Sequence, residues 1–146
     1  MQHPADQPMN ELETAALEGE PLGWAVGMAL GLHLELASPA YGNGWRTFAR
    51  YRYTATERIV RYNPHEDWAL GGPVSEMLEL STGPAGWDRH GKCVLRRAQA
   101  KGSDVCFEHT SQLVASMRAV VYARLGSTVV VPKELTWQSK GSSCRM

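Results

Sequence analysis

The chain has no excess of charge of either sign. Fifteen Lys and Arg residues balance fifteen Asp and Glu residues, so the formal net charge is zero. A chain of this kind lacks the broad positive field that general nucleic-acid coating or binding to anionic membranes requires. The charge balance argues against nucleic acid as a partner, although it still allows a local basic patch on the surface.

Cysteines and long apolar runs are also scarce. The three cysteines, Cys93, Cys106 and Cys144, are an odd number without the regular spacing of a disulfide scaffold. The first residues are polar and acidic, unlike a signal peptide. The longest apolar run, Leu22–Leu32, is shorter than the roughly 20 residues that span a bilayer. We therefore expect a cytoplasmic protein with reduced thiols and no membrane partner.

Length and composition fit one globular domain. The chain has 146 residues, of which 43% are hydrophobic and 21% charged. Both ends carry little that could pack into a core. We predict a flexible arm over residues 1–9, a single globular domain over residues 10–135 and a flexible tail over residues 136–146.

Hydrophobic periodicity predicts an α+β fold, a small single domain in which a mainly antiparallel sheet packs against two or three helices. A short helical stretch is expected over residues 12–18, with Asn10 as its N-cap, and a second helix from Pro21 to its stop at Gly31. The third is expected after Thr110 or Ser111 and ends at Gly126. The expected strands are residues 33–38, 45–53, 57–62, 74–81, 92–99, 104–108 and 127–131. Residues 63–73 and 82–91 are expected to be loops.

Three blocks resemble the NinX-like proteins of phages and prophages. The first is ELETAALEGEPLGWAVGMALG, and the third is LVASMRAVVYARLGSTVVVP. Gly23 stands where the family pattern has an acidic residue, and Gln112 where it has a proline. The second block resembles a DW-x-x-GGP motif, matched by Tyr62, Pro64, Asp67, Trp68, Gly71, Gly72 and Pro73.

The resemblance implies a phage gene expressed in the cytoplasm of the infected bacterial host. It brings no catalytic residues, because the family has no established activity. The sequence itself shows no nucleophile elbow, P-loop or dinucleotide-binding fingerprint. We therefore expect a protein that is not an enzyme and that uses no cofactor.

The DW-x-x-GGP motif has two interpretations. In the structural one, Trp68 fills the core, Asp67 caps backbone amides and the glycines permit a positive φ. In the functional one, Trp68 stacks on a ring and Asp67 accepts a hydrogen bond from a ribose or base. Gly71 and Gly72 would then offer backbone N–H groups to the ligand.

Arginines and aromatic residues alternate in the segment before this motif. Such a pattern is typical of a solvated strand face. It would also suit a nucleotide, because guanidinium groups bind phosphate and aromatic rings stack on bases. The candidate ligand-binding residues here are Arg50, Arg52, Arg58, Tyr51 and Tyr62, with Trp45 and Tyr53 among the interleaved aromatics.

One spacing resembles a zinc site. His90 and Cys93 are separated by two residues, as are Cys106 and His109. Paired ligands of this kind suit a tetrahedral ion. The two cysteines also lie in predicted strands, where thiols pack as small hydrophobic groups, and we therefore expect no metal.

These observations lead to one functional hypothesis and one alternative. The first is a phage counter-defence protein that binds and sequesters a nucleotide immune second messenger, of the cyclic oligonucleotide or cyclic ADP-ribose type, without cleaving it. The alternative is a protein-interaction module that inhibits a host defence or regulatory protein. A homo-oligomer with shared sites is compatible with a chain this small.

Overall fold

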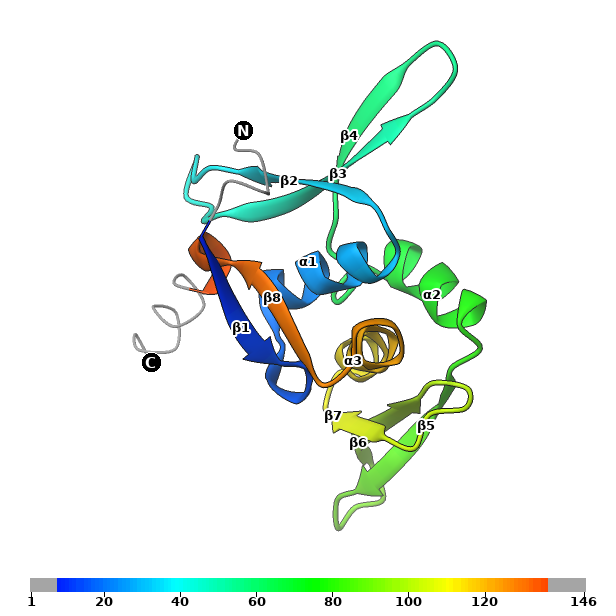
Figure 1. Ribbon diagram of the computed structural model, residues 1–146. Helices are drawn as coiled ribbons and strands as arrows, with labels where there is room; N and C mark the ends of the chain where they lie inside the picture. Colours follow the sequence, from blue (N-terminus) through cyan, green and yellow to red (C-terminus); the bar gives the residue numbers. More distant parts are fainter. Residues whose placement is uncertain (1–7, 137–146) are drawn as a thin grey trace.

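The computed structural model describes residues 8–136, which form the predicted α+β domain, with three antiparallel sheets where one was expected. The first sheet pairs the two ends of the fold, and the other two are three-stranded meanders (Figure 1). No helix among the described residues is long and apolar enough to cross a bilayer. The sheets contain β1 (Met9–Glu13) with β8 (Thr128–Pro132); β2 (His33–Ala37), β3 (Arg46–Arg52) and β4 (Glu57–Arg61); and β5 (Ser81–Trp87), β6 (Cys93–Gln99) and β7 (Cys106–His109).

The helices gather around one central member. They are the 3-10 helix η2 (Thr14–Ala16) and the α-helices α1 (Gly19–Ala29), α2 (Trp68–Met77) and α3 (Gln112–Leu125); residues 133–136 are also helical. Figure 1 shows α3 in the middle of the molecule, where it packs against α1, α2, β6 and β7.

Helix α3 begins and ends where the sequence predicts. The Ser111 hydroxyl accepts a hydrogen bond from the Val114 N–H at 3.3 Å, and Gly126 ends the helix with a φ of 92°. The predicted single apolar face is only part of what is buried, because Ser116 and Arg118 are buried too. A helix enclosed on several sides cannot keep a polar face in solvent.

The main core lies between α1, α3 and the first two sheets. Leu22, Trp24 and Val26 from α1 meet Met117 and Val121 from α3 there. Full burial of one such aliphatic side chain contributes about 1.5–3 kcal/mol to folding. A smaller cluster joins the far side of α3 to the third sheet, through Ala98, Phe107, Ala115 and Ala119.

The predicted hairpin of β3 and β4 is present. Thr47 and Ala49 are buried on one face of β3, as the period of two predicts. The other end of the hairpin extends beyond the helices (Figure 1). Tyr53 and Arg52, near that end, are exposed.

The helix predicted over residues 12–18 with Asn10 as its cap is present only as the short 3-10 helix η2. Residues 9–13 form β1, which pairs with β8 in a register that sets Leu12 opposite Val129. The Asn10 side chain donates a hydrogen bond to the Thr136 hydroxyl at 2.8 Å, so it does not cap a helix. Strand β8 lacks any other partner among the described residues, and this pairing outweighs a weak local helix signal.

The prediction for residues 63–91 is also corrected. The expected loop and the following expected strand contain α2, which runs through Gly71, Gly72 and Pro73 to Met77. The expected loop over residues 82–91 contains most of β5, whose glycines and proline pair with β6 across two register shifts. Turn residues can occupy a strand when bulges absorb their irregular geometry.

The predicted flexible ends fall mostly outside the described residues. Residues 1–7 and 137–146 lie beyond them. Met9 begins β1 and Thr136 is buried. These two residues therefore belong to the fold and not to an arm or a tail.

Candidate functional site

The predicted Asp67-Trp68 pair forms the beginning of α2. The Asp67 carboxylate accepts a hydrogen bond from the Ala69 N–H at 2.9 Å, which is the geometry of an N-cap. The Trp68 side chain is 59% exposed, so it does not fill the core. Asp67 has the structural role that the sequence suggested, whereas Trp68 is open to a partner.

The two glycines of the motif have different surroundings. A Cβ on Gly71 would lie 2.3 Å from the Pro64 carbonyl oxygen, so glycine permits a close approach. The Gly71 N–H donates to the Asp67 carbonyl oxygen at 2.9 Å and is not available to a ligand. A Cβ on Gly72 would have open space around it. Apart from the two neighbouring residues in the chain and the helix backbone, the nearest atom would be Cε3 of Trp68 at 4.0 Å.

Arg50, a predicted phosphate ligand, is already paired with two carboxylates. Its guanidinium donates to both oxygens of Glu35, one of them at 2.9 Å, and also contacts Glu57. The hydrogen bond from Arg50 lowers the pKa of the buried Glu35 carboxyl, which therefore stays ionised. Arg50 serves to compensate a buried charge.

Arg52 and Arg58 are more open. The Arg52 side chain is 78% exposed and lies 3.6 Å from a carboxylate oxygen of Glu57. Arg58 is exposed and stands opposite the half-buried Tyr51 in the ladder. Arg52 pairs with Glu57 and Arg58 with Tyr51, so the two arginines lie on opposite faces of the hairpin, which extends away from α2 (Figure 1). The structure does not gather them with Trp68 into one pocket.

Tyr62 belongs to the core. It is 2% exposed, and burial raises the pKa of its phenol above the ordinary value. Its hydroxyl oxygen is buried without a hydrogen-bond partner. A ring in this position cannot stack on a ligand at the surface.

The four residues of the alternative zinc set do not meet. In the ladder of β6 and β7, Cys106 pairs with Gln99, six residues from Cys93. At about 3.3 Å per residue this separation approaches 20 Å. His90 lies in the turn before β6, and the His109 ring instead lies 3.3 Å from a carboxylate oxygen of Glu18. The spacing in the sequence therefore does not correspond to a shared site.

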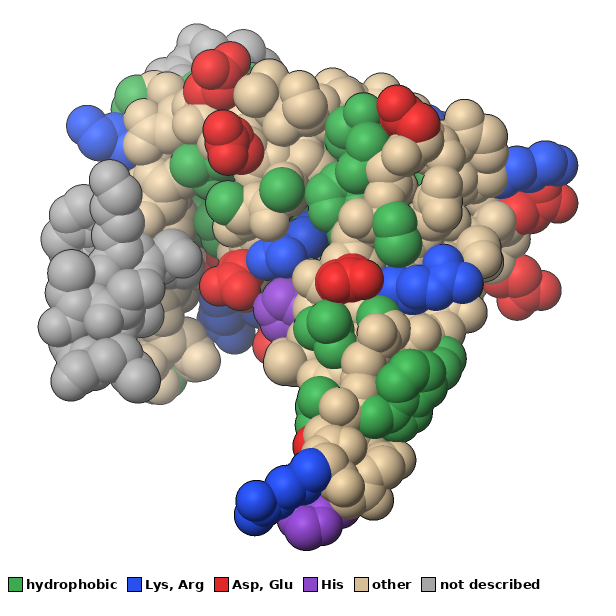
Figure 2. Space-filling view, turned by 90° about the horizontal axis from the view of Figure 1, so that it is seen from below, with side chains coloured by type: hydrophobic (Ala, Val, Ile, Leu, Met, Phe, Trp, Pro, Cys, Tyr) green, Lys and Arg blue, Asp and Glu red, His purple; other side chains and the backbone are tan. Residues whose placement is uncertain are grey.

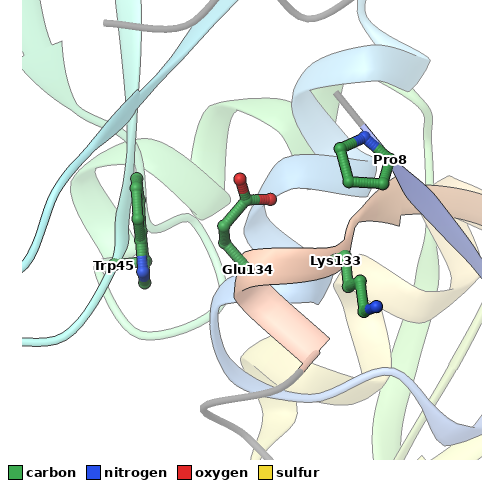
Figure 3. Close-up of a pocket in the computed structure, with 4 residues that line it drawn as sticks. All are labelled: Pro8, Trp45, Lys133 and Glu134. Atoms are coloured by element: carbon green, nitrogen blue, oxygen red, sulfur yellow. The ribbon is translucent and has the colours of Figure 1, made fainter. Parts of the chain in front are cut away.

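A pocket of about 290 Å³ lies between the residues that follow β8 and the residue that precedes β3. It is lined by Pro8, Trp45, Lys133 and Glu134 (Figure 3). The Lys133 N–H donates to the Pro8 carbonyl oxygen at 3.0 Å, which holds this wall in place. The Glu134 carboxylate extends between the Trp45 indole and the Pro8 ring (Figure 3).

Glu134 gives this pocket its chemical character. Oxygen Oε1 of its carboxylate is buried without a hydrogen-bond partner. Buried polar atoms are nearly always paired, and an unpaired acceptor costs about 1–3 kcal/mol. A ligand with N–H donors on a flat ring could satisfy this oxygen while it lies near the indole. The lysine could meet a negative group at the rim.

Sequence reasoning included Trp45 only as one of several aromatic residues and missed Lys133 and Glu134. The indole and the carboxylate are almost ninety positions apart, so no local pattern links them. The relevant signal, a Lys-Glu pair after the last strand, is too common to be diagnostic.

A comparison with protein families identifies the chain's relatives. The model described as Bacteriophage P22, NinX matches residues 13–124. That segment covers the first sequence block from Glu13 onward, the whole second block and the third block as far as Arg124, but neither Lys133 nor Glu134. No curated protein matches the chain.

Proposed function

Because this chain belongs to the NinX family of phage proteins, we propose that it is a counter-defence protein that sequesters a nucleotide second messenger of bacterial immunity. The ligand class is a cyclic oligonucleotide or a cyclic ADP-ribose, held without cleavage. The observation that carries the proposal is the unpaired buried oxygen of Glu134 beside Trp45 in a pocket.

A nucleotide offers partners for each wall of this pocket. A base near Trp45 could stack for about 1–3 kcal/mol, and N–H groups on its edge would donate to Glu134. A hydrogen bond to a charged acceptor contributes about 1.5–3 kcal/mol. Lys133, which is exposed, would approach a phosphate.

The pocket volume limits how much of the ligand it encloses. A volume near 290 Å³ lies at the lower limit of ordinary ligand sites, enough for one nucleoside. One base anchored in this way falls short of the ~12 kcal/mol of nanomolar binding. The remainder of a cyclic ligand would lie outside, within reach of further basic groups or a second subunit.

The first experiment is a ligand panel. The purified protein is incubated with cyclic dinucleotides, larger cyclic oligonucleotides and cyclic ADP-ribose isomers, and its Tm is recorded. A ligand at one hundred times its Kd stabilises the fold by ~2.7 kcal/mol, which is a clear shift. The ligand is then recovered after heat denaturation. Intact ligand supports sequestration, and a cleaved product makes the protein an enzyme.

Matched variants locate the site. Glu134→Gln keeps the shape but replaces an acceptor oxygen by an amide, so affinity should fall by roughly 10–100-fold. Trp45→Ala should weaken binding similarly. Trp87→Ala removes an exposed tryptophan on β5, outside this pocket, and should leave affinity unchanged. Equal affinity in all three variants would place the ligand elsewhere.

Exposed apolar side chains favour the alternative function, inhibition of a host protein. On α2, Trp68 and Met77 are exposed. Figure 2 shows hydrophobic side chains on a projecting part of the surface, and Trp87 and Val94 of the third sheet are exposed. Exposed aromatic residues are typical anchors of protein interfaces. Loss of host-protein capture in Trp68→Ala, with no ligand from the panel bound by the parent, would favour this alternative.

A further inference from the structure

Three side chains able to hold a metal ion meet between α1 and the turn before α2. Glu20 lies in the first turn of α1, and His65 and Glu66 lie in the turn itself. One ring nitrogen of His65 and one carboxylate oxygen from each glutamate all lie within 4.8 Å of one another. No other set of three His, Cys, Asp or Glu residues within residues 8–136 meets so closely.

His65 distinguishes this group from an ordinary cluster of surface acids. It is 6% exposed, and its Nδ1 is buried without a hydrogen-bond partner. Burial lowers the pKa of the ring, so the imidazole is neutral near pH 7 and has an unshared lone pair. Buried polar nitrogens are normally satisfied by a partner. A ligand at this position would supply one.

The two carboxylates are held in place by their own hydrogen bonds. Oε1 of Glu20 accepts from the Thr47 N–H at 2.9 Å, and Oε1 of Glu66 accepts from the Asn63 amide at 2.9 Å. Contacts of this outer kind orient the ligands of metal sites and raise their affinity.

Arg61 sets the net charge of the group. Its guanidinium contacts Glu20 and lies 3.7 Å from Glu66, so one positive charge faces two negative ones. A net charge of −1 still attracts a divalent cation, but less strongly than two free carboxylates. Calcium takes six to eight oxygen ligands, and this group offers too few oxygen atoms to favour it. One imidazole with two carboxylates suits zinc.

We propose that Glu20, His65 and Glu66 bind a zinc ion that joins the first turn of α1 to the turn before α2. At zinc–ligand distances of about 2.1 Å, tetrahedral ligand atoms lie ~3.4 Å apart, so the side chains close in by roughly 1 Å. Water would take the fourth position. The ion would fix the turn from which α2 and its exposed Trp68 begin. This site is independent of the nucleotide pocket.

The test uses the full chain with Cys93, Cys106 and Cys144 replaced by serine, so that thiols cannot capture the ion. After chelation, ZnCl₂ is titrated by calorimetry and CoCl₂ by visible absorption. We expect one equivalent of zinc, a rise in Tm, and a cobalt spectrum of nitrogen and oxygen ligands. Absence of stoichiometric binding would overturn the proposal.

Single variants then assign the ligands. Glu66→Gln changes a side chain that is 58% exposed, and should weaken zinc binding at least about tenfold. Glu20→Gln should have the same effect. Glu76→Gln removes an exposed carboxylate from α2 and should leave affinity unchanged. Zinc affinity that stays at the parent value in both Glu66→Gln and Glu20→Gln would show that the ion binds elsewhere.

Discussion

Gly71 and Pro64 approach each other so closely that no side chain fits between them. A Cβ at position 71 would lie 2.3 Å from the Pro64 carbonyl oxygen and 2.7 Å from Cδ2 of Leu113. The glycine therefore lets α2 pack on its own preceding turn and on α3 at once. The neighbouring Gly72 has no such contact.

This difference predicts unequal effects for two adjacent substitutions. Gly71→Ala should destabilise the fold by ~3 kcal/mol, because the methyl group meets backbone that cannot rotate away. Gly72→Ala should change stability by less than ~1 kcal/mol, because the gain in helix propensity is offset by the restriction that Pro73 places on the residue before it. Urea unfolding of both variants measures the two changes. Equal effects would mean that α2 does not contact the Pro64 carbonyl as described.

Asp67 should contribute to stability as an N-cap. Asp67→Ala removes the acceptor of the Ala69 N–H and should cost ~1 kcal/mol. Asp67→Asn keeps an oxygen acceptor and should cost much less. Thermal unfolding of the pair provides the measurement. A loss of ligand affinity in Asp67→Ala, with stability unchanged, would instead support a binding role.

Arg50 should matter for folding and not for ligand binding. Arg50→Met leaves the buried Glu35 carboxyl without the partner that lowers its pKa, so it should destabilise the fold clearly. Arg52→Met, on the same strand and more exposed, should change stability by less than ~0.5 kcal/mol. Chemical denaturation compares them. An Arg50→Met variant as stable as the parent would contradict the buried pair.

His65 should make stability depend on pH under metal-free conditions. Its pKa is lowered in the fold, chiefly by burial, from an ordinary value of 6.5. The unfolded chain therefore binds the proton first as pH falls. The contribution is fully present above pH 6.5 and is lost as pH falls from there through the folded-state pKa.

The matching measurement is the free energy of unfolding against pH for the parent and His65→Gln. The parent should lose stability in this window, and the variant should show a flatter profile. His90→Gln, in an exposed turn, serves as the control and should follow the parent. Parallel profiles for the parent and His65→Gln would contradict a buried neutral imidazole.

Some features of the candidate sites could be predicted from the sequence and others could not. The N-cap role of Asp67 was one of the two interpretations that the sequence predicted for the motif. It could be predicted because the cap joins residues only two positions apart. The ion pairs of Arg50 were not predicted, because Glu35 and Glu57 lie on the two neighbouring strands. In the sequence, a strand face of arginines that pair with carboxylates has the same pattern as one that faces solvent.

The sequence by itself determined the α+β class, the hairpins and the ends of α3, because these follow from periodicity, capping and turn residues within a few positions. It also indicated the protein family, through sequence blocks that occur in a fixed order. Only the tertiary structure decided that residues 9–13 form a strand, since that choice depends on β8 at the opposite end of the fold. The same holds for the pocket of Trp45 and Glu134 and for the meeting of Glu20 with His65. Such contacts arise where distant segments pack, and local sequence does not encode their geometry.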